Sequence, residues 1–218
     1  MTKGILGYLA ILSTMFLLAG RIDYWQGWVY GASGLMVLLV IAILFCNKTD
    51  LIQERLKPGP GTKWWDKVFY ACYLPTLLAI FVVASLDAGR FRSTPPLPLA
   101  VYSVGYLLMG FAYVMSFWAM WTNRFFSSVV RIQADRGHYV IQDGPYRFVR
   151  HPGYVGGMTL VLSIAVVLGS LWALIPSGMV VMLLVVRTAL EDTALQRELP
   201  EYSDYAKKVQ YRLLPGVW

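Results

Sequence analysis

The sequence predicts an all-α fold, a polytopic bundle of transmembrane helices in a single domain of 218 residues. Hydrophobic residues make up 57% of the chain, charged residues make up 14%, and the mean hydropathy is +0.55. A soluble domain is about 45–50% apolar and about 25% charged. The apolar residues also gather into about six segments, and crossing a hydrocarbon core of ~30 Å takes roughly 20 helical residues. Most charged residues lie between these segments.

The first four apolar segments follow one another along the chain, at residues 5–19, 25–45, 68–86 and 97–121. The fifth and sixth come from one long run, residues 155–186, which Gly169 and Ser170 interrupt. This run is too long for one straight span, and a Gly-Ser pair suits a tight turn. The sequence therefore predicts that the last two segments form a helical hairpin with short arms.

The first segment resembles a signal peptide, because Lys3 precedes an apolar run that ends in Leu18-Ala19-Gly20. However, the run contains no A-x-A site, and no cysteine follows Gly20. Five further apolar segments come after it. We therefore expect an uncleaved first helix.

The distribution of Lys and Arg predicts the orientation. If the N-terminus lies inside, the outer loops hold only Arg21, Arg90 and Arg92, and the inner segments hold the other 16 of the 19 basic residues. The positive-inside rule then places both termini, the 122–154 segment and the tail in the cytoplasm, in an inner or cytoplasmic membrane. This topology accounts for the net charge of +7. We therefore expect the lipid bilayer, and no nucleic acid, as a partner.

Cysteine and histidine spacing predicts no metal site. Cys46 and Cys72 form no CxxC motif and have no other paired spacing. Both lie in or beside apolar segments, which predicts buried free thiols. His138 and His151 have no metal-ligand spacing to each other or to a cysteine. The chain also contains no GxGxxG after a strand, no Walker A loop and no GxSxG, so a soluble Rossmann-type cofactor domain is excluded.

A polar, basic segment, GPYRFVRHPGY at residues 144–154, lies between long apolar runs. Because charge near hydrocarbon is costly, clustered charge at a membrane boundary indicates a functional site. Upstream, residues 139–141 are β-like and residues 142–145 have the composition of a turn. Pro152 suits the first turn of the fifth helix, whose N-terminus favours anions. The alternative is a basic interfacial loop that holds lipid headgroups.

Two carboxylates, Glu191 and Asp192, follow the last apolar run and are expected to end the sixth helix. In a hairpin, Tyr154 and Arg187 would lie together at the open end, which brings His151 close to Glu191. The alternative for Glu191 is a surface ion pair with Arg187, four residues earlier. An acidic pair at a helix C-terminus opposes the macrodipole, and a cationic ligand would offset that cost.

The tail beyond Pro200 predicts a short amphipathic helix at residues 202–209, which would lie at the membrane interface or act as a lid. The tail reads YxxYxxxVxxRLLP from Tyr202 to Pro215. Together with the RHPxY element at residues 150–154 and the Glu191–Asp192 pair, it resembles the isoprenylcysteine carboxyl methyltransferase family of membrane methyltransferases. The likeness covers residues 120–218. Similar RHPxY elements alone also occur in phospholipid N-methyltransferases and membrane sterol reductases.

The resemblance implies an S-adenosylmethionine-dependent methyltransferase that acts on a lipophilic or amphiphilic acceptor, such as an isoprenylcysteine carboxylate. It implies that the cofactor binds at the cytoplasmic face within residues 122–218, while residues 1–121 supply the N-terminal spans. The implied catalytic residues are Arg150, His151 and Glu191. The implied cofactor-binding residues are His138, Gly144, Tyr146, Arg150, His151, Pro152, Tyr154 and Glu191.

Two positions depart from the family pattern or leave it open. Asp192 stands where the family has the second residue of a Glu-Glu pair, and either Arg131 or Gln133 matches a cofactor-side Gln of the eukaryotic branch.

The chemistry of the cofactor agrees with these residues. Glu191 could bind its amino group, and Arg150 or the N-terminus of the fifth helix could bind its carboxylate. The ring of Tyr154 or Tyr146 could face the adenine or the sulfonium. A carboxylate or thiolate acceptor needs no general base, whereas a protonated amine would need His151 or Glu191.

Three other functions stay open on the sequence. They are a phospholipid or amine N-methyltransferase, an NADPH-dependent sterol-type reductase, and a non-enzymatic scaffold whose basic loops bind anionic lipid. The carboxylate pair counts against the reductase, because the 2′-phosphate of NADPH favours additional Arg residues.

Overall fold

The computed structural model describes residues 2–45 and 61–218, and over these residues the fold is helical without strands, as the sequence predicts. Six long helices correspond to the six apolar segments, and a short helix follows in the tail. Their bounds are α1 Thr2–Ala19, α2 Trp25–Phe45, α4 Trp64–Ala84, α5 Leu99–Thr122, α6 Pro152–Val167, α7 Leu174–Glu198 and α8 Tyr202–Lys208. A π-helical turn, η1 (Ser85–Phe91), continues α4.

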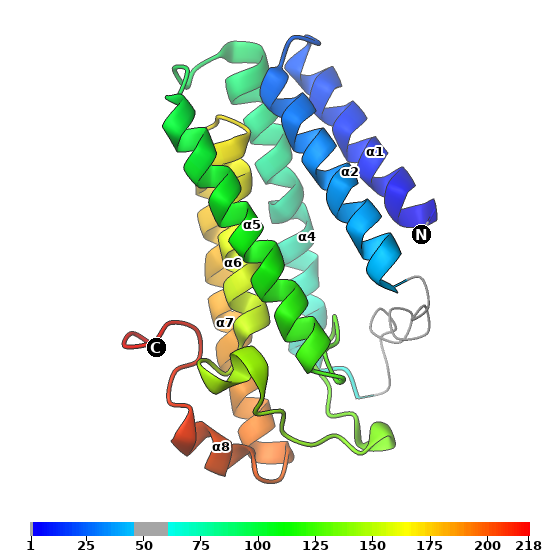
Figure 1. The fold of residues 1–218 in the computed structure, drawn as a ribbon, viewed down its shortest axis with the longest axis vertical. Coiled ribbons are helices and arrows are strands. Elements are labelled where there is room, and N and C mark those ends of the chain that lie inside the picture. Colours follow the sequence, from blue (N-terminus) through cyan, green and yellow to red (C-terminus); the bar gives the residue numbers. More distant parts are fainter. Residues whose placement is uncertain (1, 46–60) are drawn as a thin grey trace.

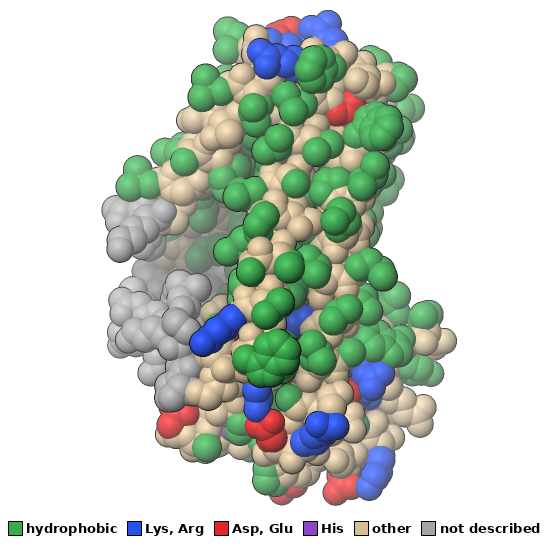
Figure 2. Space-filling model, turned by 180° about the vertical axis from the view of Figure 1, so that it is seen from behind, with side chains coloured by type: hydrophobic (Ala, Val, Ile, Leu, Met, Phe, Trp, Pro, Cys, Tyr) green, Lys and Arg blue, Asp and Glu red, His purple; other side chains and the backbone are tan. Residues whose placement is uncertain are grey.

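In the described part of the chain, four helices are long and apolar enough to cross a membrane. They are Trp25–Ile43, Trp64–Phe91, Leu99–Thr122 and Leu174–Glu198. The other two apolar helices, Gly4–Ala19 and Pro152–Val167, are shorter. Figure 2 shows hydrophobic side chains over the middle of one face of the molecule, with Lys and Arg gathered toward its two ends. This distribution is that of a protein embedded in a bilayer.

The helices form an elongated bundle in which α4, α5, α6 and α7 run side by side and α1 and α2 pair along the outside (Figure 1). Small residues allow the closest contact, between α5 and α6. A Cβ added at Gly156 would lie 2.3 Å from Ser116 Oγ and 2.9 Å from the Ala112 carbonyl oxygen. The glycine therefore lets α6 approach the backbone of α5 directly, which fixes the start of α6 beside the end of α5.

The turn between α6 and α7 confirms the predicted hairpin. Gly169 adopts φ +75°, a left-handed conformation that favours glycine. Ser170 donates a hydrogen bond to Asp87 Oδ2 at 2.5 Å, and Thr94 donates to the same carboxylate from its backbone nitrogen (2.8 Å) and its hydroxyl (2.6 Å). The buried Asp87 in η1 thus ties the hairpin turn to the end of α4.

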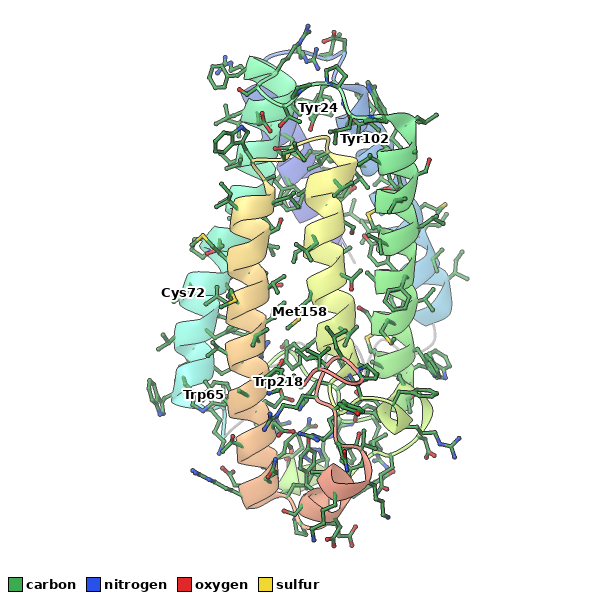
Figure 3. All side chains as sticks on the ribbon, turned by 90° about the vertical axis from the view of Figure 1, so that its left-hand side faces the viewer. Tyr24, Trp65, Cys72, Tyr102, Met158 and Trp218 are labelled. Carbon is green, nitrogen blue, oxygen red and sulfur yellow. The ribbon has the colours of Figure 1, made fainter. Side chains whose placement is uncertain are left out.

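The same end of the bundle carries further polar ties. Tyr24 and Tyr102 lie there, far from Trp218 and Trp65 (Figure 3). The Tyr24 hydroxyl donates to the Leu168 carbonyl oxygen at 2.6 Å, across 144 positions of sequence. These bonds hold the N-terminal helices against the hairpin.

The sixth helix is longer than the sequence predicts. It does not end at Glu191 and Asp192, as expected, but continues to Glu198, so both carboxylates lie inside α7. Residues 188–198 are rich in Ala, Leu, Glu, Gln and Arg, which favour helix. The macrodipole argument for a cationic ligand therefore does not apply.

Two smaller predictions are also wrong. Residues 139–141 form no strand, because no other extended segment in the described part of the chain pairs with them. Cys72 is free but exposed on α4, and not buried, because it faces outward from the bundle. Cys46 lies outside the described residues.

Adjacent glycines on α6 give a matched test of the α5–α6 contact. We expect Gly156→Ala to destabilise the protein by about 1–3 kcal/mol, the range for an overpacked core. At Gly157, an added Cβ would meet only Leu184 Cδ1, at 3.9 Å. Gly157→Ala should therefore be neutral or slightly stabilising. Thermal unfolding in detergent, followed by tryptophan fluorescence, compares the two variants, and equal melting temperatures would contradict the contact.

Candidate functional site

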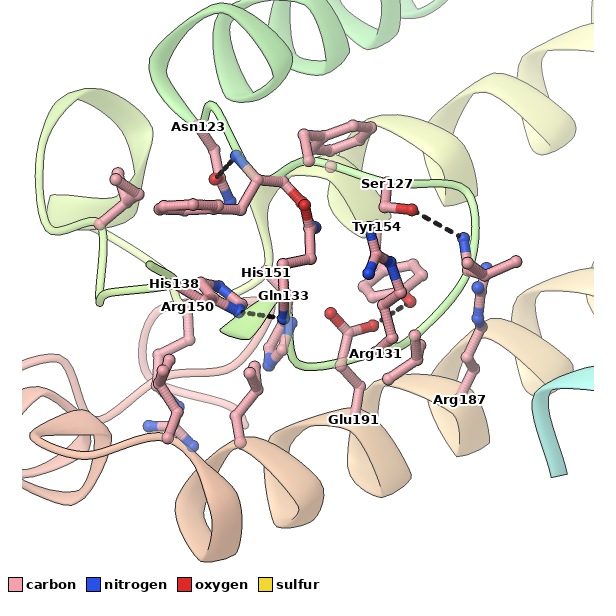
Figure 4. Close-up of a pocket in the computed structure, with 18 of the residues that line it drawn as sticks. Asn123, Ser127, Arg131, Gln133, His138, Arg150, His151, Tyr154, Arg187 and Glu191 are labelled. Atoms are coloured by element: carbon pink, nitrogen blue, oxygen red, sulfur yellow. Dashed lines mark hydrogen bonds between the residues drawn. The ribbon is translucent and has the colours of Figure 1, made fainter. Parts of the chain in front are cut away.

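One cavity lies at the end of the bundle where α5 ends, α6 begins and α7 passes into α8, as Figure 4 shows in close-up. Its volume is about 290 Å³, at the lower end of the ~300–1,000 Å³ typical of ligand pockets. Its walls come from α4, from the 123–146 segment, from the start of α6, and from α7 and α8. Both charge-rich segments of the sequence therefore meet at one end of the bundle, as the hairpin predicts.

The wall of this cavity is built around the buried carboxylate of Asp192 on α7. This side chain is fully buried and accepts hydrogen bonds from three other segments of the chain. Its partners are Arg150 and His151 before α6, Gln196 on α7, Tyr202 on α8 and Arg212 in the tail. Because a buried carboxylate must be paired to be tolerated, these contacts are mutually dependent.

Arg150 is fully engaged by these contacts. Its Nε lies 2.8 Å from Asp192 Oδ1, and its Nη2 lies 3.1 Å from Asp192 Oδ2. Its Nη1 donates to the carbonyl oxygens of Val209 and Gln210 at 2.7 and 2.8 Å. The sequence suggested Arg150 as a ligand for a cofactor carboxylate, but the structure commits its guanidinium to Asp192 and to the tail.

His151 is also directed at Asp192. Its Nε2 lies 3.2 Å from Asp192 Oδ1, and the Tyr202 hydroxyl donates to the same oxygen at 3.0 Å. The backbone N–H groups of Arg150 and His151 donate to the carbonyl oxygens of Tyr211 and Arg212. The tail is thereby paired with the RHPxY segment, and α8 covers the end of the cavity.

A second carboxylate, Glu191, faces the cavity one residue earlier. It is half-buried and accepts a short hydrogen bond from the Tyr154 hydroxyl. The predicted surface ion pair with Arg187 is not among the contacts of the described residues. Arg187 instead reaches Asp66 on α4, because its Nε lies 2.8 Å from Asp66 Oδ1 and its Nη2 lies 3.2 Å from Asp66 Oδ2.

Arg187 was not singled out as a site residue from the sequence, and neither were its neighbours Phe69 and Tyr70 on α4. The guanidinium carbon lies 4.5 Å from the ring centre of Phe69 and 5.1 Å from that of Tyr70. Asp66 and Tyr70 belong to the first turns of α4, so a helix distant in sequence supplies one wall of the cavity. The signal that could have revealed it is Asp66 itself, an acid at the edge of an apolar segment.

His138 lies in the wall formed by the 123–146 segment. Its Nδ1 accepts a hydrogen bond from the Gln133 backbone nitrogen at 3.3 Å, so its Nε2 carries the proton in the neutral ring. Burial, with the nearby charges of Arg131 and Arg136, lowers the pKa of His138 to about 4. The ring is therefore neutral near pH 7 and can donate one hydrogen bond.

Tyr146 and Tyr154 line the cavity, whereas Gly144 and Pro152 are not part of its wall. Gly144 adopts φ +57° and packs against α5, where an added Cβ would lie 2.7 Å from Thr122 Oγ1. Pro152 is fully buried as the first residue of α6. Both residues shape the backbone around the cavity.

The Asp192 contacts predict a stability effect. We expect Asp192→Asn to destabilise the protein by about 3–5 kcal/mol, because it leaves the buried Arg150 without its anion. The matched control is Asp204→Asn on α8, whose ion pair with Lys207 is exposed and should matter little. Thermal unfolding in detergent measures both. A wild-type melting temperature for Asp192→Asn would show that the carboxylate does not hold these segments together.

The lowered pKa of His138 predicts that the stability of the protein depends on pH. The unfolded chain protonates this ring near pH ~6.5, and the folded chain does so only near 4. Protonation therefore favours unfolding, and the contribution of His138 to stability, fully present above pH ~6.5, is lost as the pH falls toward 4. We expect His138→Gln to show a smaller fall in melting temperature over this window than the wild type. Parallel curves would contradict the burial of a neutral ring.

Comparison with known proteins gives a match over the part of the chain that forms much of the cavity. No curated protein matches the chain. The model of the isoprenylcysteine carboxyl methyltransferase (ICMT) family matches residues 105–197, a little under half of the chain. The match runs from α5 through α6 and most of α7, and so includes the RHPxY element, Glu191 and Asp192. It confirms the resemblance seen in the sequence: over residues 105–197 the chain is similar to this family of membrane methyltransferases.

Proposed function

We propose that this protein is an integral membrane methyltransferase that uses S-adenosylmethionine to methylate a lipophilic or amphiphilic acceptor. One observation carries the proposal. Within the family-matched segment, a cavity brings together the carboxylate Glu191, the neutral ring of His138 and several aromatic side chains at one end of a membrane bundle.

The residues that line the cavity suit the charged amino-acid end and the adenine of the cofactor. Glu191 makes no ion pair among the described residues, so its charge is available for an amino group. The rings of Phe125, Phe126 and Tyr139 offer faces for an adenine, and His138 offers a hydrogen-bond donor. Arg131 adds a buried Nε without a hydrogen-bond partner in the described part of the chain.

When bound, the cofactor supplies an activated methyl group on a sulfonium. The protein residues hold and orient the reactants and exclude water, which are the main contributions to a displacement of this kind. Arg150, His151 and Asp192 position the wall and the tail over the cavity. Their mutual contacts make them positioning residues in this proposal, and Glu191 is the residue that touches the cofactor.

The acceptor is proposed to arrive from the bilayer. Tyr70 and Tyr73 on α4, Gly157 on α6 and Leu184 on α7 line the part of the cavity that lies among the apolar helices. We further propose, from the Lys and Arg distribution, that the cavity opens on the cytoplasmic face. A carboxylate or thiolate acceptor would need no base, and Glu191 is the nearest candidate base for an amine.

The first test is cofactor binding. Calorimetry on detergent-purified protein should detect S-adenosylmethionine or its demethylated product. Binding of NADPH, with no binding of either compound at millimolar concentration, would replace the methyltransferase with a reductase. An acceptor is then sought by incubating the protein with labelled methyl donor and a membrane lipid extract.

Glu191→Gln tests the proposed contact. It keeps the shape of the side chain and removes the charge, and a charge-assisted hydrogen bond contributes about 1.5–3 kcal/mol. We expect cofactor affinity to fall about 10- to 150-fold, with no loss of thermal stability. The matched control is Glu198→Gln on the same helix, whose partner Lys63 lies at 2.6 Å on the surface. Equal affinities for the two variants would remove Glu191 from the site.

A further inference from the structure

Three arginines line the cavity among the described residues, and two of them are already committed. Arg150 is bonded to Asp192 and to two carbonyl oxygens of the tail. Arg187 is paired with the fully buried Asp66 and donates to the Ser128 carbonyl oxygen at 2.6 Å. Both guanidinium groups are therefore already paired with buried carboxylates of the protein.

Arg131 is different, because its only ion-pair partner in the described structure is exposed. Its Nη1 lies 3.1 Å from Asp135 Oδ1, and the Asp135 side chain is 57% exposed. Such a solvent-exposed pair is weak. The Arg131 side chain itself is 10% exposed, and its Nε is buried without a hydrogen-bond partner in the described part of the chain. A buried donor that is left unpaired is rare in native proteins and points to a missing partner.

The position of Arg131 relates this missing partner to Glu191. Arg131 reaches the cavity from the segment between α5 and α6, and Glu191 reaches it from α7 (Figure 4). The lining of the cavity therefore offers a cation from one segment and an anion from another. A ligand with an amino group and a carboxylate on the same carbon complements both charges at once.

We propose that Arg131 binds the carboxylate of the amino-acid portion of the cofactor while Glu191 binds its amino group. This inference rests on the proposed function and deepens it. It assigns the carboxylate to Arg131, in place of the Arg150 that the sequence suggested. It also makes the cavity selective for ligands that carry a complete amino-acid end.

The test compares ligands that differ in this end. Calorimetry at pH 7.5 is carried out with S-adenosylhomocysteine, with decarboxylated S-adenosylmethionine, and with methylthioadenosine, which lacks both charged groups. Arg131→Gln should weaken S-adenosylhomocysteine binding about 10- to 150-fold, the loss expected for one charge-assisted bond. The same variant should bind the decarboxylated compound as the wild type does. Glu191→Gln should weaken both of these ligands and leave methylthioadenosine unaffected.

Asp135→Asn is the matched control, because it removes the only ion-pair partner of Arg131 seen in the described structure. If Arg131 serves a ligand, this variant keeps the affinity for S-adenosylhomocysteine while Arg131→Gln loses it. The inference is overturned if Arg131→Gln weakens the carboxylate-bearing and decarboxylated ligands equally, or if Asp135→Asn reproduces its loss. The choice of pH keeps His138 neutral in every variant, since Arg131 is one of the charges that lower its pKa.

Failure of the proposed function gives a different result. In that case the wild-type protein binds none of the three adenosine ligands. A wild type that binds them, with Arg131→Gln retaining full affinity for S-adenosylhomocysteine, overturns only the assignment of Arg131.

Discussion

The buried carboxylate of Asp192 is the interaction on which the cavity depends. It accepts hydrogen bonds from the RHPxY segment, from α8 and from the tail, and so joins all three to α7. A carboxylate removed from water is stabilised only by such partners, and each partner in turn loses its counter-charge if the carboxylate is absent. Asp192 is therefore the side chain at which these segments meet at the end of the bundle.

A second ion pair supports the other side of the cavity. Arg187 and Asp66 join α7 to α4, and the backbone nitrogen of Val130 donates to the same Asp66 at 2.9 Å. The loop that carries Arg131 and His138 is thus anchored at its start by a carboxylate of α4. Asp66 and Asp192 are both paired with arginines of the protein. Glu191 is therefore the carboxylate that faces the cavity, and it gives the lining a negative charge.

Contacts elsewhere in the bundle keep α5, α6 and α7 in register, and so hold the residues of the cavity in place. Gly156 brings the backbones of α5 and α6 together, and Asp87 fixes the turn between α6 and α7 at the opposite end. A hairpin held at its turn cannot slide along its neighbours, so Tyr154 and Glu191 stay in register. Packing at one end of the molecule therefore determines geometry at the other.

The sequence by itself determined the helical membrane class, the positions of the apolar helices and the hairpin at Gly169. These features follow from local composition and from the length of apolar runs, which each segment carries independently of the others. The sequence also located the polar segment that lines the cavity and indicated the resemblance to a methyltransferase family.

Only the tertiary structure decided which charged residues are free. The sequence does not distinguish Arg131 from Arg150 and Arg187. Among the described residues, Arg150 and Arg187 are paired with buried carboxylates from other helices, whereas Arg131 is paired only with the exposed Asp135. The partners of Asp192, which come from before α6, from α8 and from the tail, were likewise visible only in the folded structure. Pairing between side chains that are distant along the chain depends on how the helices pack, and no local pattern encodes it.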